Sequence, residues 1–193
     1  MSFFAFAKDP GLRASRRAFL QNSSGLALSA GAVALLAGRE SLARGTQGDA
    51  ENDTRILNTA LAAELEAIAA YQVGADSGLL QKPVLAIAVA FQGHHREHAD
   101  VLAKTIAKLG GKPAAAKERY VFPLEKLKTQ ADVLSFAATL EKGAVSAYLG
   151  AVPSFGDRQL AKAAASILGD EAMHWAVLRQ ALGEFPVPGA FVS

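Results

Sequence analysis

The chain has 193 residues, no cysteine, and a formal net charge of +2 from 20 basic and 18 acidic side chains. Its length suits one domain with a short additional segment. The near balance of charge argues against nucleic acid as a partner, and the lack of cysteine excludes disulfides, thiolate catalysis and Cys-ligated zinc. Alanine supplies 41 residues, which favours helices. No apolar run reaches the ~18 residues of a membrane-spanning helix, so we expect a soluble, mostly helical domain.

The N-terminal segment has the order of residues found in an export signal. Two adjacent arginines, Arg16 and Arg17, precede an apolar run of small residues at 26–38. Ser41-Leu42-Ala43 then forms a small-x-small cleavage pattern. The arginine pair resembles the twin-arginine export signal.

This resemblance implies that the twin-arginine export machinery is a partner and that the location is periplasmic. We expect residues 1–44 to be the signal and residues 45–52 to be a linker. A basic N-terminal helix is the alternative interpretation, as is a membrane anchor that is not cleaved.

Four helical segments are expected in the remainder of the chain. Helix-ending glycines follow three of them, and a proline follows the other. The expected spans are Asp53 to Ser77, Pro83 to Gly110, Gln130 to Ala151, and Asp157, as N-cap, to Leu182.

The second pair of helices repeats the first pair. Glu64 and Tyr71 recur as Glu141 and Tyr148, 77 residues later, and the surroundings of His98 recur around the histidine at 174. A helical hairpin is therefore present twice, and two such hairpins make a four-helix bundle.

The connections predict how the hairpins join. Short links within each hairpin make its two helices antiparallel, whereas residues 112–129 separate the hairpins. At ~3.3 Å per residue this segment can span ~60 Å, more than the ~38 Å of a 25-residue helix. We expect an all-α four-helix bundle at 53–183, with one long crossover between its second and third helices and a tail at 184–193.

Charged residues interrupt the apolar stripe of each helix. Apolar residues spaced by three and four mark the buried seams, and each seam is apolar except near its middle. The interruptions are Glu64 in the first helix, His95 and His98 in the second, Glu141 in the third, and Glu171 and His174 in the fourth. An antiparallel bundle brings these mid-helix positions to one level. Burying them requires a compensating charge, and a divalent metal cluster would supply it.

With these residues the sequence resembles the ferritin-like superfamily, and within it the exported bacterial ferritin-like domain proteins. In that family the first and third helices each supply one Glu, and the second and fourth each supply Glu-x-x-His. Glu64 and Glu141 match the single carboxylates, and Glu171 with His174 matches the motif of the fourth helix.

The second helix departs from the family pattern. His98 matches its histidine, but His95 stands where the family has Glu. One of the two metal bridges would then be an imidazole, and three carboxylates leave two ferrous ions with one unbalanced positive charge. We expect weaker or mononuclear metal binding, or a metal that tolerates more nitrogen. An alternative is that His94 or Glu97 replaces His95 as ligand.

The resemblance implies iron as the metal, as a di-iron or a mononuclear site, with manganese or zinc as alternatives. The expected chemistry is reaction with dioxygen or peroxide, as in a ferroxidase or another oxidoreductase. The tail after Gly183 contains Pro186 and Pro188 and cannot form the fifth helix of ferritin cages. We therefore expect a monomer or a homodimer.

Other interpretations remain open from sequence alone. A Glu or His on an apolar stripe is more commonly a satisfied core residue than a ligand. A salt-bridged Glu–His layer would also suit a bundle that has lost its metal, and the exported family is similar to plant desiccation-related proteins. The alternative function is thus a non-enzymatic envelope stress protein. Tyr71 and Tyr148 are expected either to hydrogen-bond groups of the site or only to pack in the core.

Overall fold

The computed structural model describes residues 47–192, so the predicted export signal lies outside the described range. This part of the chain forms four long α-helices and two 3-10 turns. The elements are α3 Gln47–Asp76, α4 Lys82–Lys108, η2 Leu124–Lys126, α5 Gln130–Ala151, η3 Val152–Ser154 and α6 Arg158–Ala181. None of these helices is both long enough and apolar enough to cross a membrane.

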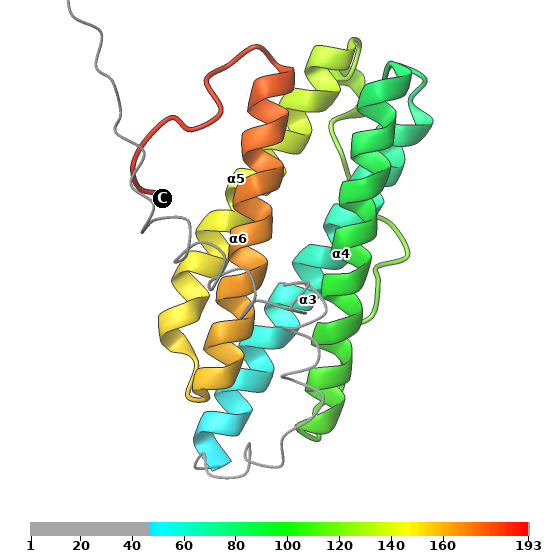
Figure 1. Cartoon of the computed structure of the whole chain (residues 1–193). Coiled ribbons are helices and arrows are strands. Elements are labelled where there is room, and N and C mark those ends of the chain that lie inside the picture. The colour runs from blue at the N-terminus through cyan, green and yellow to red at the C-terminus, as the bar shows by residue number, and fades with distance from the viewer. Residues whose placement is uncertain (1–46, 193) are drawn as a thin grey trace, which may run out of the picture.

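The helices form a bundle of two antiparallel hairpins, α3 with α4 and α5 with α6 (Figure 1). The link between the hairpins runs the length of the bundle, from the end of α4 to the start of α5 at the opposite end, so that α4 and α5 point the same way. The expected all-α bundle with one long crossover is confirmed.

The helix ends follow the local signals in the sequence. Thr129 and Asp132 form a reciprocal capping box at the start of α5, and the Asp157 carboxylate accepts hydrogen bonds from the first turn of α6. Gly78 and Gly110 follow α3 and α4 with φ of 69° and 80°, a left-handed conformation that glycine adopts without strain. Only the start of α3 differs clearly from expectation, since the helix begins at Gln47, within the predicted linker.

Two polar side chains of α3 attach distant segments to the bundle. The buried Asp53 carboxylate accepts hydrogen bonds from the backbone N–H groups of Gly156 and Asp157, at 2.8 and 3.0 Å. Asn58 accepts a hydrogen bond from the backbone N–H of Ala114, at 2.7 Å, and so holds the first part of the crossover. The turn of one hairpin and the crossover are both fixed to the same helix.

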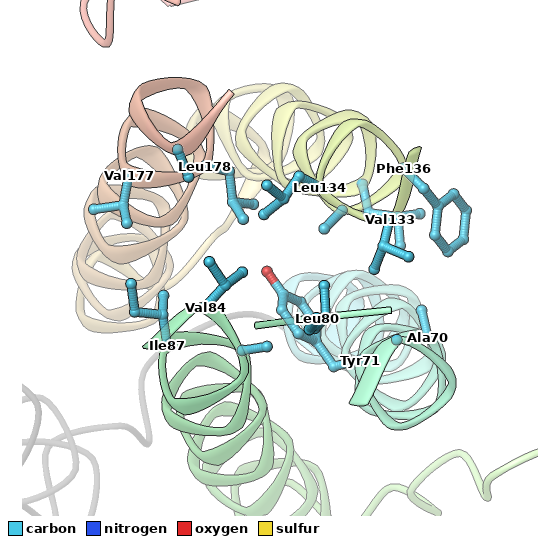
Figure 2. Close-up of a pocket in the computed structure, with 15 residues that line it drawn as sticks. Ala70, Tyr71, Leu80, Val84, Ile87, Val133, Leu134, Phe136, Val177 and Leu178 are labelled. Carbon is cyan, nitrogen blue, oxygen red and sulfur yellow. The ribbon is translucent and has the colours of Figure 1, made fainter. Parts of the chain in front are cut away.

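The core consists of two apolar clusters with a polar layer between them. The first cluster includes Leu57, Leu61, Leu102, Ile106 and Leu160. The second comprises Tyr71, Phe91, Leu134, Ala138 and Leu178. Figure 2 shows the end of the bundle that contains the second cluster, where side chains from all four helices point into one apolar space. The apolar packing on both sides shields the polar layer from water.

Candidate metal centre

The polar layer receives side chains from all four helices. Each of these residues lies on the inward stripe of its helix, as the spacings of three and four predict. They are Glu64 of α3, His95 and His98 of α4, Glu141 of α5, and Glu171 and His174 of α6. Five of them are buried and His98 is partly buried. The structure thus brings together all six residues that the sequence predicts as ligands.

The first group of ligand atoms, called group A here, comes from Glu64, His95, His98 and Glu171. His95 Nδ1 lies 2.8 Å from Glu64 Oε2 and 3.6 Å from Glu171 Oε1. His98 Nδ1 lies 3.1 Å from the same Glu171 oxygen. All four atoms lie within 4.8 Å of one another, a spacing that lets them surround one ion.

The second group, group B, comes from His95, Glu141, Glu171 and His174. Glu141 Oε1 lies 3.3 Å from His95 Nε2 and 3.5 Å from His174 Nδ1. Glu171 Oε2 lies 3.3 Å from the same nitrogen of His174. This group also has two nitrogen and two oxygen donors.

Two residues contribute to both groups. Glu171 directs Oε1 to group A and Oε2 to group B. His95 directs Nδ1 to group A and Nε2 to group B. The imidazole of His95 and the carboxylate of Glu171 are therefore shared by the two groups.

Five buried polar atoms of this layer have no hydrogen-bond partner among the described residues. They are His98 Nδ1, Glu141 Oε2, both carboxylate oxygens of Glu171, and His174 Nδ1. Each buried unpartnered polar group costs about 1–3 kcal/mol. Their convergence within ligand distance means that a bound cation would satisfy them together. Mixed imidazole and carboxylate donors fit a divalent transition metal such as iron, manganese or zinc.

The surrounding carboxylates hold protons on the buried imidazoles. Burial by itself lowers the pKa of His95, but hydrogen bonds to Glu141 and Glu64 outweigh it and raise the pKa to about 10. Burial is likewise outweighed at His98 and His174, where carboxylates raise the pKa to about 9. An arriving metal ion must displace these protons.

The pKa values of the three carboxylates in the layer are not all shifted in the same direction. Burial raises the pKa of Glu64, but His95 and His98 outweigh this effect and bring the pKa down to about 2. At Glu141 the imidazoles also outweigh burial and lower the pKa. At Glu171 burial prevails, and the pKa is raised. Glu171 is therefore the carboxylate least compensated by the protein.

Two tyrosines hydrogen-bond to Glu64 and Glu141, each from the other helix of the α3–α5 pair. The Tyr148 hydroxyl of α5 donates a hydrogen bond to Glu64 Oε1, at 2.6 Å, and the Tyr71 hydroxyl of α3 donates one to Glu141 Oε1. Burial, followed by the neighbouring carboxylate, raises the pKa of both tyrosines well above its ordinary value. Both hydroxyls stay protonated and orient the carboxylates.

A third cluster lies between α4 and α6 and shares His174 with group B. The structure buries His95 and leaves the side chain of His94 46% exposed, so His94 does not replace it in the layer. His94 Nδ1 lies 3.1 Å from Asp170 Oδ2 and 2.8 Å from His174 Nε2. The sequence pattern does not single out Asp170, although its position four residues before His174 places both on one helix face.

A groove between α3 and α5 reaches the layer from the opposite face. Its volume is about 520 Å³, and most of its lining is small and apolar, as at Ala60 and Ala144. Glu64, His95 and Glu141 also line this groove. Its size is typical of a small-molecule pocket, so the layer is open to a small apolar molecule on this side.

Metal-free protein should lose stability as the pH rises above neutrality. The raised pKa values of the three buried histidines mean that their protons stabilise the fold fully below pH 6.5, and that this contribution is lost through about pH 9 to 10. We expect the Tm of chelator-treated protein to fall by about 5 °C or more between pH 6.5 and 9. Stoichiometric Zn²⁺ should remove this fall, because the ion replaces the protons. A metal-free Tm that stays constant over this range would contradict the assignment.

A family model described as "Ferritin-like domain" matches residues 52–184. A conserved hypothetical protein from Mycobacterium tuberculosis has a similar structure, with a TM-score of 0.64 and 23% identity over 76% of this chain and 99% of that one. A structure described as ferritin-like, diiron-carboxylate, from Bacillus anthracis str. Ames, has a TM-score of 0.60 and 21% identity over 69% of this chain and 97% of that one. No curated protein matches.

At these identities the solved structures show that the fold is shared. The family match covers the bundle except for the first five residues of α3, and it includes every residue of groups A and B. The chain belongs to the ferritin-like domain family.

Proposed function

We propose that the protein is an exported ferritin-like metal protein that binds iron in its buried layer, as two ions or one, and reacts with dioxygen or peroxide. Its role would be the oxidation or detoxification of iron. The observation that carries the proposal is the convergence of three carboxylates and three imidazoles, with five unpartnered atoms, in one buried layer. The description of the Bacillus anthracis structure as a diiron-carboxylate protein supports the same chemistry.

Groups A and B are the residues that would hold the metal. Bound ferrous iron supplies the electrons that reduce dioxygen or peroxide. The carboxylates of Glu64, Glu141 and Glu171 are hard ligands suited to the oxidised ion. Tyr71 and Tyr148 keep two of these carboxylates oriented, and the apolar clusters on both sides exclude water. The alanine-lined groove admits an apolar molecule such as dioxygen to Glu64 and Glu141.

His95 distinguishes this layer from the carboxylate-rich pattern of the family. A neutral imidazole carries a proton on one ring nitrogen and so would bind one ion only, and the three carboxylates would leave two ferrous ions with one unbalanced positive charge. This imbalance favours a mononuclear iron site, or occupancy by an ion that accepts more nitrogen, such as zinc.

A second candidate function is supported by the ion pairs that the layer forms without metal. His95 donates to Glu64 at 2.8 Å, and the two groups stabilise each other's charged forms. A layer neutralised in this way could persist in a non-enzymatic envelope protein that acts in stress protection. The two functions differ in metal content and turnover.

Oxygen consumption on addition of ferrous iron separates the two functions. We expect the wild-type protein to consume oxygen, and Glu171→Ala and His174→Ala to lower the rate at least about tenfold, because each removes a ligand. Glu97→Ala is the matched control, since Glu97 is exposed on α4 close to the ligand histidines. Circular dichroism should show that all variants remain helical. Wild-type protein with neither bound metal nor turnover would favour the structural function.

The His95 position can be tested by restoring the fourth carboxylate. We expect His95→Glu to raise ferrous iron affinity by about tenfold and to bring iron content closer to two ions per chain. His95→Gln is the matched control, since it has nearly the same size as Glu but no charge. Elemental analysis and equilibrium dialysis measure both quantities. Two irons per wild-type chain would show that the imidazole does not limit binding.

The proposal also includes export through the twin-arginine route. It is supported by Arg16 and Arg17, which precede an apolar run and a small-x-small pattern. Replacing both arginines by lysine should leave the precursor in the cytoplasm, as measured by cell fractionation and immunoblotting. Unchanged delivery of the double variant to the periplasm would refute the twin-arginine assignment.

A further inference from the structure

The cluster at the outer edge of the buried layer has the geometry of a cation site. We call His94, Asp170 and His174 the outer cluster. Its three facing atoms form a triangle: His94 Nδ1 to His174 Nε2 is 2.8 Å, His94 Nδ1 to Asp170 Oδ2 is 3.1 Å, and His174 Nε2 to Asp170 Oδ2 is 3.3 Å. Ligands at about 2.1 Å from an octahedral ion, at right angles to each other, are about 3.0 Å apart. The triangle therefore matches one face of a coordination shell.

Three imidazoles and one carboxylate oxygen converge at this cluster. His98 Nε2 also lies 3.4 Å from Asp170 Oδ2, so one carboxylate oxygen faces three imidazole nitrogens. An ionised carboxylate has about two acceptor sites on each oxygen. Because His94 Nδ1 and His174 Nε2 hydrogen-bond to each other at 2.8 Å, one of them accepts, and the two acceptor sites of that oxygen match the remaining donors. In place of these protons, a cation would bind the oxygen and both nitrogens together.

The outer cluster connects solvent to the buried layer. The side chain of His94 is 46% exposed and that of Asp170 is 23% exposed, whereas that of His174 is 2% exposed. His174 directs Nε2 to the outer cluster and Nδ1 to group B. His98 likewise directs Nε2 to Asp170 and Nδ1 to group A. A cation at the outer cluster is thus separated from each inner group by a single imidazole ring.

Outside the buried layer, the groove on the opposite face presents fewer metal ligands to a hydrated ion. The groove between α3 and α5 is lined mainly by alanine and other small or apolar residues. Glu66 is the charged residue that this lining adds to the inner residues Glu64, His95 and Glu141, so few of its side chains replace the water ligands that a divalent ion gives up on entry. Among the described residues, His94 and Asp170 therefore give the α4–α6 side the larger set of outer ligands that can exchange for water.

We infer that His94 and Asp170, together with His174, form a loading site at which a divalent transition-metal ion binds before it passes to the buried layer. The inference rests on the proposed function, since it requires the inner groups to hold metal. His94 and Asp170 act on uptake and are not permanent ligands of groups A and B. Their loss should therefore change the rate of loading and not the final content.

Stopped-flow uptake of Co²⁺ by metal-free protein tests this inference, because cobalt bound by imidazole and carboxylate absorbs visible light. We expect His94→Ala to take up Co²⁺ about tenfold more slowly than wild type. The final cobalt content, from elemental analysis after equilibrium dialysis, should be unchanged. Glu97→Ala, which removes an exposed charge from the same helix, should load at the wild-type rate. Asp170→Asn should slow loading as His94→Ala does.

The outcomes separate the inference from the proposed function. Equal uptake rates for His94→Ala, Glu97→Ala and wild type would overturn the loading site while leaving the inner metal site intact. A lower final content in His94→Ala at an unchanged rate would also overturn it, by making His94 a permanent ligand. Wild-type protein that binds no cobalt, iron or zinc would overturn the proposed function as well.

Discussion

The burial of three carboxylates and three imidazoles between two apolar clusters is the constraint on which the structure depends. An ionised group transferred alone into such an interior costs several kcal/mol. Here each charge has partners of opposite sign, as the lowered pKa of Glu64 and the raised pKa of His95 show. The six side chains form one electrostatic unit, so a change at one of them alters the protonation of the others.

Within this unit Glu171 is the residue with the greatest need for a cation. It is fully buried, both of its oxygens lack a hydrogen-bond donor, and its pKa is raised. Glu64 and Glu141 differ from Glu171, because a tyrosine hydroxyl donates a hydrogen bond to each of them. The other residue common to groups A and B is His95, and its side chain brings no negative charge. The two shared positions of the layer therefore hold one carboxylate and one imidazole.

Most of the bundle could be predicted because local chemistry determines it. Capping residues and glycines mark the helix ends, and spacings of three and four place Glu64, Glu141 and Glu171 on inward faces. The internal repeat set the register of His95. The start of α3 was not predicted correctly. The helix begins at Gln47, whereas the sequence led us to expect a start at Asp53.

The contacts between helices were harder to predict, since they depend on how the helices rotate and approach one another. Asp170 meets His94 only because α4 and α6 lie side by side at that level. Sequence left open whether Tyr71 and Tyr148 bond to the site or only pack. The groove between α3 and α5 likewise depends on interhelical distance, which no residue pattern specifies.

The crossed tyrosines make the two halves of the protein interdependent. Tyr71 of the first hairpin donates a hydrogen bond to Glu141 of the second. Tyr148 of the second hairpin donates one to Glu64 of the first. Either half in isolation would lose the hydroxyl that orients its own acid, and would carry only part of each ligand set. A primordial single hairpin could have assembled the same centre only by self-association, and fusion into one chain would have made that pairing permanent.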